Sequence, residues 1–112
     1  AVWSIPGNLG RQYAKVSGDW NPIHTTALTA KLFGFKRAIA HGMWTLARAL
    51  GEMDQDLPTH SVGIMASFRR PVFLPSRLRF ESGELGDTLG FELREARSGR
   101  VCLSGTVNPL VR

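Results

Sequence analysis

The sequence has little cysteine: Cys102 is the only one among 112 residues. One cysteine excludes a disulfide within the chain and a cysteine-based zinc site. Long hydrophobic runs are also missing, since no stretch approaches the ~18 consecutive apolar residues that a membrane-spanning helix needs. These absences favour a reducing compartment, so we expect a cytoplasmic protein that makes no membrane contact.

Acidic residues are few, with 9 Asp and Glu against 14 Lys and Arg, which gives a net charge of +5. Arginine makes up most of the positive charge. Its planar guanidinium binds phosphate with two parallel hydrogen bonds, so a phosphate-bearing ligand is expected. The basic residues cluster only at Arg69 and Arg70 and at Arg77 and Arg79. This distribution favours a small phosphate site over a nucleic-acid groove.

The first half of the chain predicts one short strand and three helices. Residues 1–5 are β-prone and end at Pro6 and Gly7. A helix is expected from Asn8 to Ser17, with its apolar face at Leu9, Tyr13 and Val16. We expect no regular structure over residues 19–24, because proline lacks a backbone donor. A second helix is capped by Thr25 or Thr26 and stopped by Gly34.

The third predicted helix is the clearest. One apolar stripe runs along it at helical spacing: Met43, Leu46, Ala47, Leu50 and Met53. After about residue 60 the hydrophobic period changes from 3.6 to 2, which indicates strands. Turn residues at 86–87 and 98–99 predict that the last three strands form an antiparallel meander.

This order of elements predicts an α+β domain spanning residues 1–112. The sheet is expected to wrap around the helix of residues 43–53 and bury its stripe. Such a sheet leaves an unpaired edge and an apolar rim, with Phe68, Val72 and Phe73 available for contact. We therefore expect the domain to pair with a copy of itself or with a similar domain.

Asp19 and His24 lie on either side of Asn21 and Pro22, in a segment stiffened by the proline. A carboxylate and an imidazole directed at one point can bind a water molecule and move its protons, which hydration and dehydration require. The alternative is structural, because Asp and Asn are common turn residues whose side chains bond to nearby backbone. Both interpretations remain open on this pattern alone.

Gly42 follows His41 at the start of the long helix. Without a side chain there, a ligand oxygen can approach the backbone N–H at the positive end of the helix, as an oxyanion site requires. The alternative is that Gly42 only turns the chain and His41 caps the helix. Asp19, His24 and His41 form no compact metal motif, so no metal is expected.

Residues 13–43 resemble the signature of the MaoC-like (R)-specific enoyl-CoA hydratases. The matching residues are Tyr13-Ala14, Ser17-Gly18-Asp19, Asn21-Pro22-Ile23-His24, Gly34-Phe35 and Ile39-Ala40-His41-Gly42-Met43. The resemblance implies the hotdog fold, an antiparallel sheet wrapped around one central helix. It also implies that Asp19 and His24 hold the catalytic water, that the Gly42 N–H binds the thioester carbonyl, and that Asn21 shapes the loop.

The implied function is a lyase of fatty acyl metabolism, a hydratase or dehydratase acting on the α,β double bond of an acyl thioester. The product is an (R)-3-hydroxyacyl thioester, and CoA or a carrier protein carries the acyl group without a separate cofactor. If the carrier is CoA, its phosphates are expected at Arg69, Arg70, Arg77 and Arg79. The alternatives are a hotdog thioesterase and a non-catalytic acyl-CoA-binding or partner module.

Residues 5–11 and Trp44 resemble the second half of tandem hotdog dehydratases more than the stand-alone enzymes. The chain also begins at Ala1 without an initiator methionine or a signal-peptide profile. The expectation is therefore either a homodimer or one domain of a longer protein, docked on a second hotdog domain.

Overall fold

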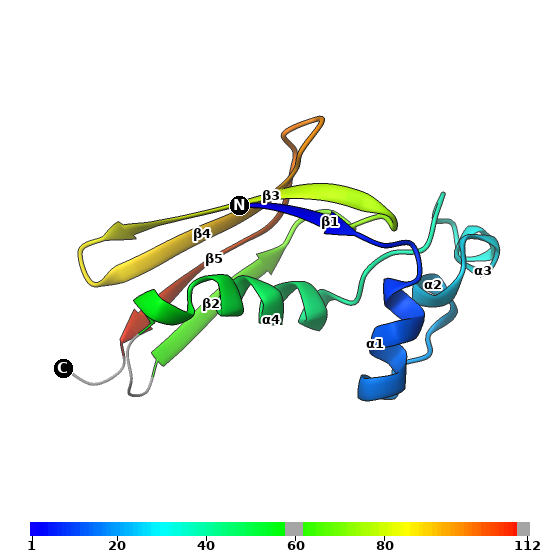
Figure 1. Cartoon of the computed structure of the whole chain (residues 1–112), viewed down its shortest axis with the longest axis horizontal. Coiled ribbons are helices and arrows are strands. Elements are labelled where there is room, and N and C mark those ends of the chain that lie inside the picture. The colour runs from blue at the N-terminus through cyan, green and yellow to red at the C-terminus, as the bar shows by residue number, and fades with distance from the viewer. Residues whose placement is uncertain (58–61, 110–112) are drawn as a thin grey trace.

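Five antiparallel strands form one sheet, and the longest helix lies across one of its faces (Figure 1). The computed structural model describes residues 1–57 and 62–109. The strand order is β1-β3-β4-β5-β2, so that β1 and β2 are the edges. The strands are β1 (Val2–Ile5), β2 (Val62–Phe68), β3 (Ser76–Leu85), β4 (Thr88–Glu95) and β5 (Val101–Pro109). The helices are α1 (Leu9–Ser17), α2 (Pro22–Thr25), α3 (Ala27–Leu32), α4 (Gly42–Glu52) and a 3₁₀ turn at Asp54–Asp56.

The predicted meander is confirmed. β3, β4 and β5 pair in sequence, and their connecting turns place Gly86 at φ 66° and Gly99 at φ 75°. Only glycine adopts such positive φ values without steric cost, which explains why the chain reverses at these two points. The observed arrangement is the predicted α+β layout of a sheet around one helix.

The core lies between the sheet and α4. Its largest fully buried side chains are Trp3, Met53, Leu78, Leu93, Leu103 and Val107. Trp3 stacks on the Phe80 ring, with centroids 5.6 Å apart, and its indole N–H donates to Glu52 on α4. β1 is therefore tied both to its neighbour in the sheet and to the helix beneath it.

The buried face of α4 differs from the predicted stripe. Met43 is 63% exposed and Ala47 is also exposed, whereas Thr45 and Ala49 are buried. Leu46 and Leu50 are partly buried against the core, and Met53 is fully buried as predicted. The helix thus faces the sheet with small residues and leaves part of its apolar stripe on the outer side.

The first helix is confirmed, and it ends at Gly18 with φ 79°. Its predicted apolar face is correct only in part: Leu9 is buried and Tyr13 is partly buried, but Val16 is 84% exposed and Gly10 and Ala14 are buried instead. The small residues allow α1 to pack closely on the segment that follows it.

Residues 19–24 are not wholly irregular, which corrects the prediction. Pro22 begins the single helical turn α2, and the Asn21 side chain caps it by accepting from the Ile23 N–H. Proline fits the first helical position because its missing N–H would have no partner there. The next helix, α3, is capped by Thr26, and Gly34 follows it at φ 93°, as predicted.

The edge strand β2 exposes Ile64, Met65 and Phe68. Val72, expected on the rim, is instead buried, and its carbonyl accepts from the Ala40 N–H. Phe73 lies beneath the Lys36 and Arg37 side chains. None of the helices in the described residues is long and apolar enough to cross a membrane.

Candidate active site

Three successive hydrogen bonds from backbone N–H groups to side-chain oxygens shape the segment between α1 and α2. The Ser17 hydroxyl accepts from the Asp19 N–H, the Asp19 Oδ1 from the Asn21 N–H, and the Asn21 Oδ1 from the Ile23 N–H. Each bond spans two residues, as in Asx turns. The structural interpretation of Asp19 and Asn21 is therefore correct, and it leaves the second carboxylate oxygen of Asp19 available for chemistry.

His24 is buried, and its Nδ1 lies 2.7 Å from the Ile39 carbonyl oxygen. A carbonyl can only accept, so Nδ1 carries a proton. In the neutral ring the free lone pair then lies on Nε2. This bond holds the ring in one orientation and leaves Nε2 able to take a proton, as a general base must.

Gly10 positions His24 through the backbone. A Cβ built on Gly10 would overlap the His24 carbonyl group. The neighbouring Arg11 donates a hydrogen bond of 2.6 Å to the Thr25 carbonyl. Helix α1 therefore packs directly against the backbone that holds His24, a role that hydrophobic periodicity did not indicate.

His41 does not cap α4 with its side chain, which corrects one of the alternatives considered from the sequence. Its Nε2 instead donates to the Asp19 carbonyl oxygen at 2.9 Å and lies 3.8 Å from the Asp19 Oδ2. Its ring stacks on His24 with centroids 3.9 Å apart. His41 therefore links the loop that bears Asp19 to the ring of His24.

Three chemically active groups consequently converge. Side-chain ligand atoms of Asp19, His24 and His41 all lie within 4.8 Å of one another, although their spacing in the sequence matches no metal motif. His24 Nδ1 and His41 Nε2 already bond to carbonyl oxygens, which limits what the three could offer a metal. A separation under 5 Å suits one water molecule held between a carboxylate and an imidazole.

A cavity of about 270 Å³ opens beside His24 and the start of α4. Gly42, Thr45 and Phe68 line it together with apolar residues that include Ile39, Val72 and Leu103. The Thr45 hydroxyl donates to the Gly42 carbonyl at 2.7 Å, and a Cβ on Gly42 would lie only 3.1 Å from the Phe68 ring. Gly42 is the first residue of α4, and the first N–H groups of a helix have no partner within it. Because Gly42 also lines the cavity, its N–H is the candidate donor to a ligand oxygen there.

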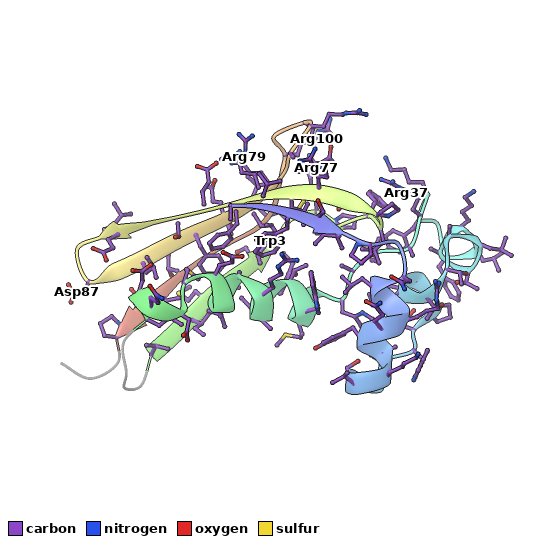
Figure 2. The ribbon with its side chains drawn as sticks, viewed as in Figure 1. Trp3, Arg37, Arg77, Arg79, Asp87 and Arg100 are labelled. Atoms are coloured by element: carbon purple, nitrogen blue, oxygen red, sulfur yellow. The ribbon has the colours of Figure 1, made fainter. Side chains whose placement is uncertain are left out.

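Arg69 and Arg70 line the same cavity, whereas Arg77 and Arg79 do not. The latter two lie on β3, separated from β2 by β4 and β5. Figure 2 shows them on the side of the sheet away from α4, while Trp3 points toward the helix. The four arginines therefore do not form one cluster.

Cys102 also lines the cavity. Burial raises the pKa of its thiol, and the nearby Glu95 carboxylate adds to this effect. The neutral thiol is the less nucleophilic form. We therefore assign Cys102 a packing role in the cavity wall and no nucleophilic one.

Comparison with known proteins agrees with this geometry. Residues 8–105 match the family described as the MaoC like domain. This chain belongs to that family. The chain is 40% identical over 110 residues to 3-hydroxyacyl-thioester dehydratase X of Mycobacterium tuberculosis, which covers 98% of this chain. It is similar to the crystal structure of HtdX from the same organism, with a TM-score of 0.91 at 39% identity and 98% of this chain covered.

A second solved relative is the (R)-hydratase from Aeromonas caviae, with a TM-score of 0.76 at 26% identity, covering 97% of this chain and 93% of that one. These neighbours confirm the hotdog fold and the resemblance seen in residues 13–43. The chain spans only 39% of the curated M. tuberculosis dehydratase and 47% of the solved HtdX chain. It therefore corresponds to one part of those longer relatives.

Proposed function

We propose that this domain hydrates the α,β double bond of an acyl thioester, or removes water in the reverse direction, through Asp19 and His24. The observation that supports this most strongly is the proximity of the Asp19 carboxylate to the His24 imidazole, which lines a largely apolar cavity. Family membership and the names of the two dehydratase and hydratase relatives point to the same reaction.

In the hydration direction, a water bound between Asp19 and His24 gives its oxygen to Cβ and one proton to the pair. The pair returns a proton to Cα, so that the elements of water are added without net change in the enzyme. Both transfers come from one side of the cavity, which implies syn addition. The (R) configuration of the product is proposed from the similarity to the (R)-specific hydratase. The hydrogen bond from His24 Nδ1 to the Ile39 carbonyl holds the ring in one orientation. Nε2 is then the ring nitrogen that exchanges a proton with the water.

The thioester carbonyl is proposed to accept from the Gly42 N–H. Charge develops on this oxygen when Cα gains electron density, and a fixed donor at a helix N-terminus stabilises that charge. The absence of a Cβ matters here, since the Phe68 ring already lies close to this position. Asn21 contributes indirectly by capping α2 and so holding His24 in place.

The rival activity in the same fold is thioester hydrolysis, and the rival of another class is acyl-thioester binding without turnover. We also propose that the domain acts when paired with a second hotdog domain or a copy of itself, in the cytoplasm, where the unpaired thiol of Cys102 stays reduced.

The direct test uses a crotonyl thioester and follows two products. Loss of enoyl absorbance without release of free thiol is the expected result. Thiol release at constant enoyl absorbance would instead identify a thioesterase, and saturable binding without either change would identify a binding module.

A further inference from the structure

His41 is a buried histidine to which the proposed chemistry gives no part; only 4% of its surface is exposed. It directly precedes Gly42, and its carbonyl accepts from the Trp44 and Thr45 N–H groups in the first turn of α4. His41 is not among the described residues that line the catalytic cavity. Any effect of this side chain on the reaction therefore passes through the residues that it contacts.

The Nε2 of His41 holds the backbone of Asp19. It lies 2.9 Å from the Asp19 carbonyl oxygen, and because a carbonyl only accepts, Nε2 carries the proton. The Asp19 side chain is 52% exposed, so this bond anchors to a buried ring a residue that packing holds only loosely. The Asp19 Oδ2 is 3.8 Å from the same nitrogen, beyond hydrogen-bond distance. The bond to His41 thus fixes Asp19 without engaging the oxygen that the water needs.

The ring of His41 holds the imidazole of His24. The two rings stack with centroids 3.9 Å apart and an interplanar angle of 22°. Tyr13, from α1, contacts the His41 ring edge-on, with centroids 4.8 Å apart. His41 is therefore packed between α1 and His24, and its flat face restricts the rotation that the single bond from His24 to the Ile39 carbonyl would still allow.

The second ring nitrogen of His41 is unpaired. Nδ1 is buried, and no hydrogen-bond partner for it exists among the residues that the structure describes. Most buried polar atoms in native proteins are paired, so an unpaired one calls for an explanation. For stability alone an apolar ring would serve better here, because it would leave no buried acceptor without a donor. What an imidazole adds is a donor and a flat face in one rigid group.

We propose that His41 is the positioning residue that sets the separation of the catalytic pair. Its Nε2–H holds Asp19 and its ring face holds His24, so one rigid side chain fixes both members. Ligand atoms of the three residues accordingly lie within 4.8 Å of one another. This inference rests on the proposed function and adds to it a residue that does not touch the substrate.

Three substitutions separate the two contacts. His41→Gln keeps an N–H donor but loses the ring face, His41→Phe keeps a ring but loses the donor, and His41→Ala loses both. With a crotonyl thioester, kcat is expected to fall roughly tenfold in each of the first two and about 10²-fold in the third, since misplacing a reacting group by about 1 Å has effects of that size. KM should stay unchanged, because His41 does not line the cavity.

Nuclear magnetic resonance follows the two partners of His41 without turnover. In the wild type, the ring nitrogen shifts of His24 should show a proton on Nδ1 and none on Nε2. The Asn21 amide proton should report its bond to the Asp19 Oδ1. His41→Gln is expected to move the His24 shifts toward a mixture of tautomers, and His41→Phe to change the Asn21 amide signal.

Val107→Ala is the control for lost stability. Val107 is fully buried near the end of β5 and does not line the cavity, so this variant should lower the melting temperature and keep the wild-type kcat. The proposal is overturned by a wild-type kcat in folded His41→Ala, by a rise in KM that matches the fall in kcat, or by unchanged signals of His24 and Asn21. Each of these outcomes leaves the hydratase function intact. If the signals change as expected but the wild type hydrates no enoyl thioester, the positioning role stands and the proposed activity fails.

Discussion

Asp19 shows that a structural and a chemical role can share one side chain. One carboxylate oxygen holds the Asn21 N–H in a turn, and the other faces His41. From the sequence the two interpretations seemed to compete, because turn residues and catalytic carboxylates look alike there. In the structure the two roles belong to different oxygens of the Asp19 carboxylate, Oδ1 and Oδ2.

Gly10 is the residue whose role was least visible in the sequence. It lies inside an amphipathic helix, where glycine usually costs stability relative to alanine. Its value depends on a contact with His24, fourteen positions later, that no local pattern reveals. We regard it as a positioning residue for the catalytic pair.

Gly10→Ala is expected to displace His24 and to lower kcat by about 10²-fold, since misplacing a reacting group by about 1 Å has effects of that size. KM for the enoyl thioester should change little, because Gly10 does not line the cavity. The measurement is steady-state kinetics at a temperature well below the unfolding transition.

Gly51→Ala is the matched control. Gly51 also lies in a helix, but an added Cβ there meets open space. This variant should keep full activity and gain up to about 1 kcal/mol of stability. If Gly10→Ala lowers only the melting temperature and keeps the wild-type kcat, its positioning role is refuted.

At the scale of elements, the helix of residues 43–53 illustrates what periodicity can and cannot predict. The apolar spacing correctly predicted that this helix exists. However, the residues buried within it are Thr45 and Ala49, neither of which belongs to the predicted stripe. Periodicity locates an apolar stripe but does not say which part of it faces the domain's own sheet. Met43 remains on the outside, as do Ile64 and Phe68 on β2.

Ile64, Met65 and Phe68 leave exposed apolar side chains along the edge strand β2, and Met43 does so at the start of α4. A long edge strand with exposed apolar residues is prone to pair with another chain. The Phe68 ring lies against Gly42, so this edge also adjoins the catalytic cavity. Pairing and activity are therefore expected to depend on each other.

Ile64→Lys should weaken pairing by placing a charge on this edge, and it should lower hydration in parallel. Leu85→Lys, which alters an apolar residue at the far end of β3 that is more exposed than Ile64 (76% against 41%), should change neither. Light scattering and the hydration assay, run on the same samples, check both. A monodisperse, fully active 12.3 kDa wild-type species would contradict the pairing.

At the scale of the whole molecule, the layout could be predicted because each half of the chain has its own hydrophobic period. Turn residues such as Gly86 and Gly99 marked the meander, since their backbone conformation is demanded locally. The order of strands and the identity of the edges could not be predicted in this way, because they depend on contacts between distant segments.

The same distinction applies to the candidate site: residues close together in the sequence could be predicted, and residues that only the fold brings together could not. Asp19, His24 and Gly42 stand within one contiguous stretch, so the resemblance of residues 13–43 could indicate all three. Phe68 comes from the other half of the chain, and only the fold brings its ring to Gly42 in the cavity wall. No local pattern marked Phe68 as a residue of this cavity.

The central claim is that Asp19 and His24 together move the protons of water. Asp19→Asn keeps an oxygen that can accept from the Asn21 N–H, and His24→Asn keeps an N–H near the position of the ring Nδ1. His24 is buried in α2 rather than on an open polar loop, so circular dichroism must accompany the kinetics.

The most direct measurement is the hydration rate of a crotonyl thioester by these two variants and the wild type at equal folded concentration. Each variant is expected to lose about 10²–10⁴-fold in kcat, the usual contribution of a positioned acid–base group. The double variant should be hardly slower than either single one, because both residues serve one water. Near-normal turnover by either folded single variant would contradict the assignment of the catalytic pair.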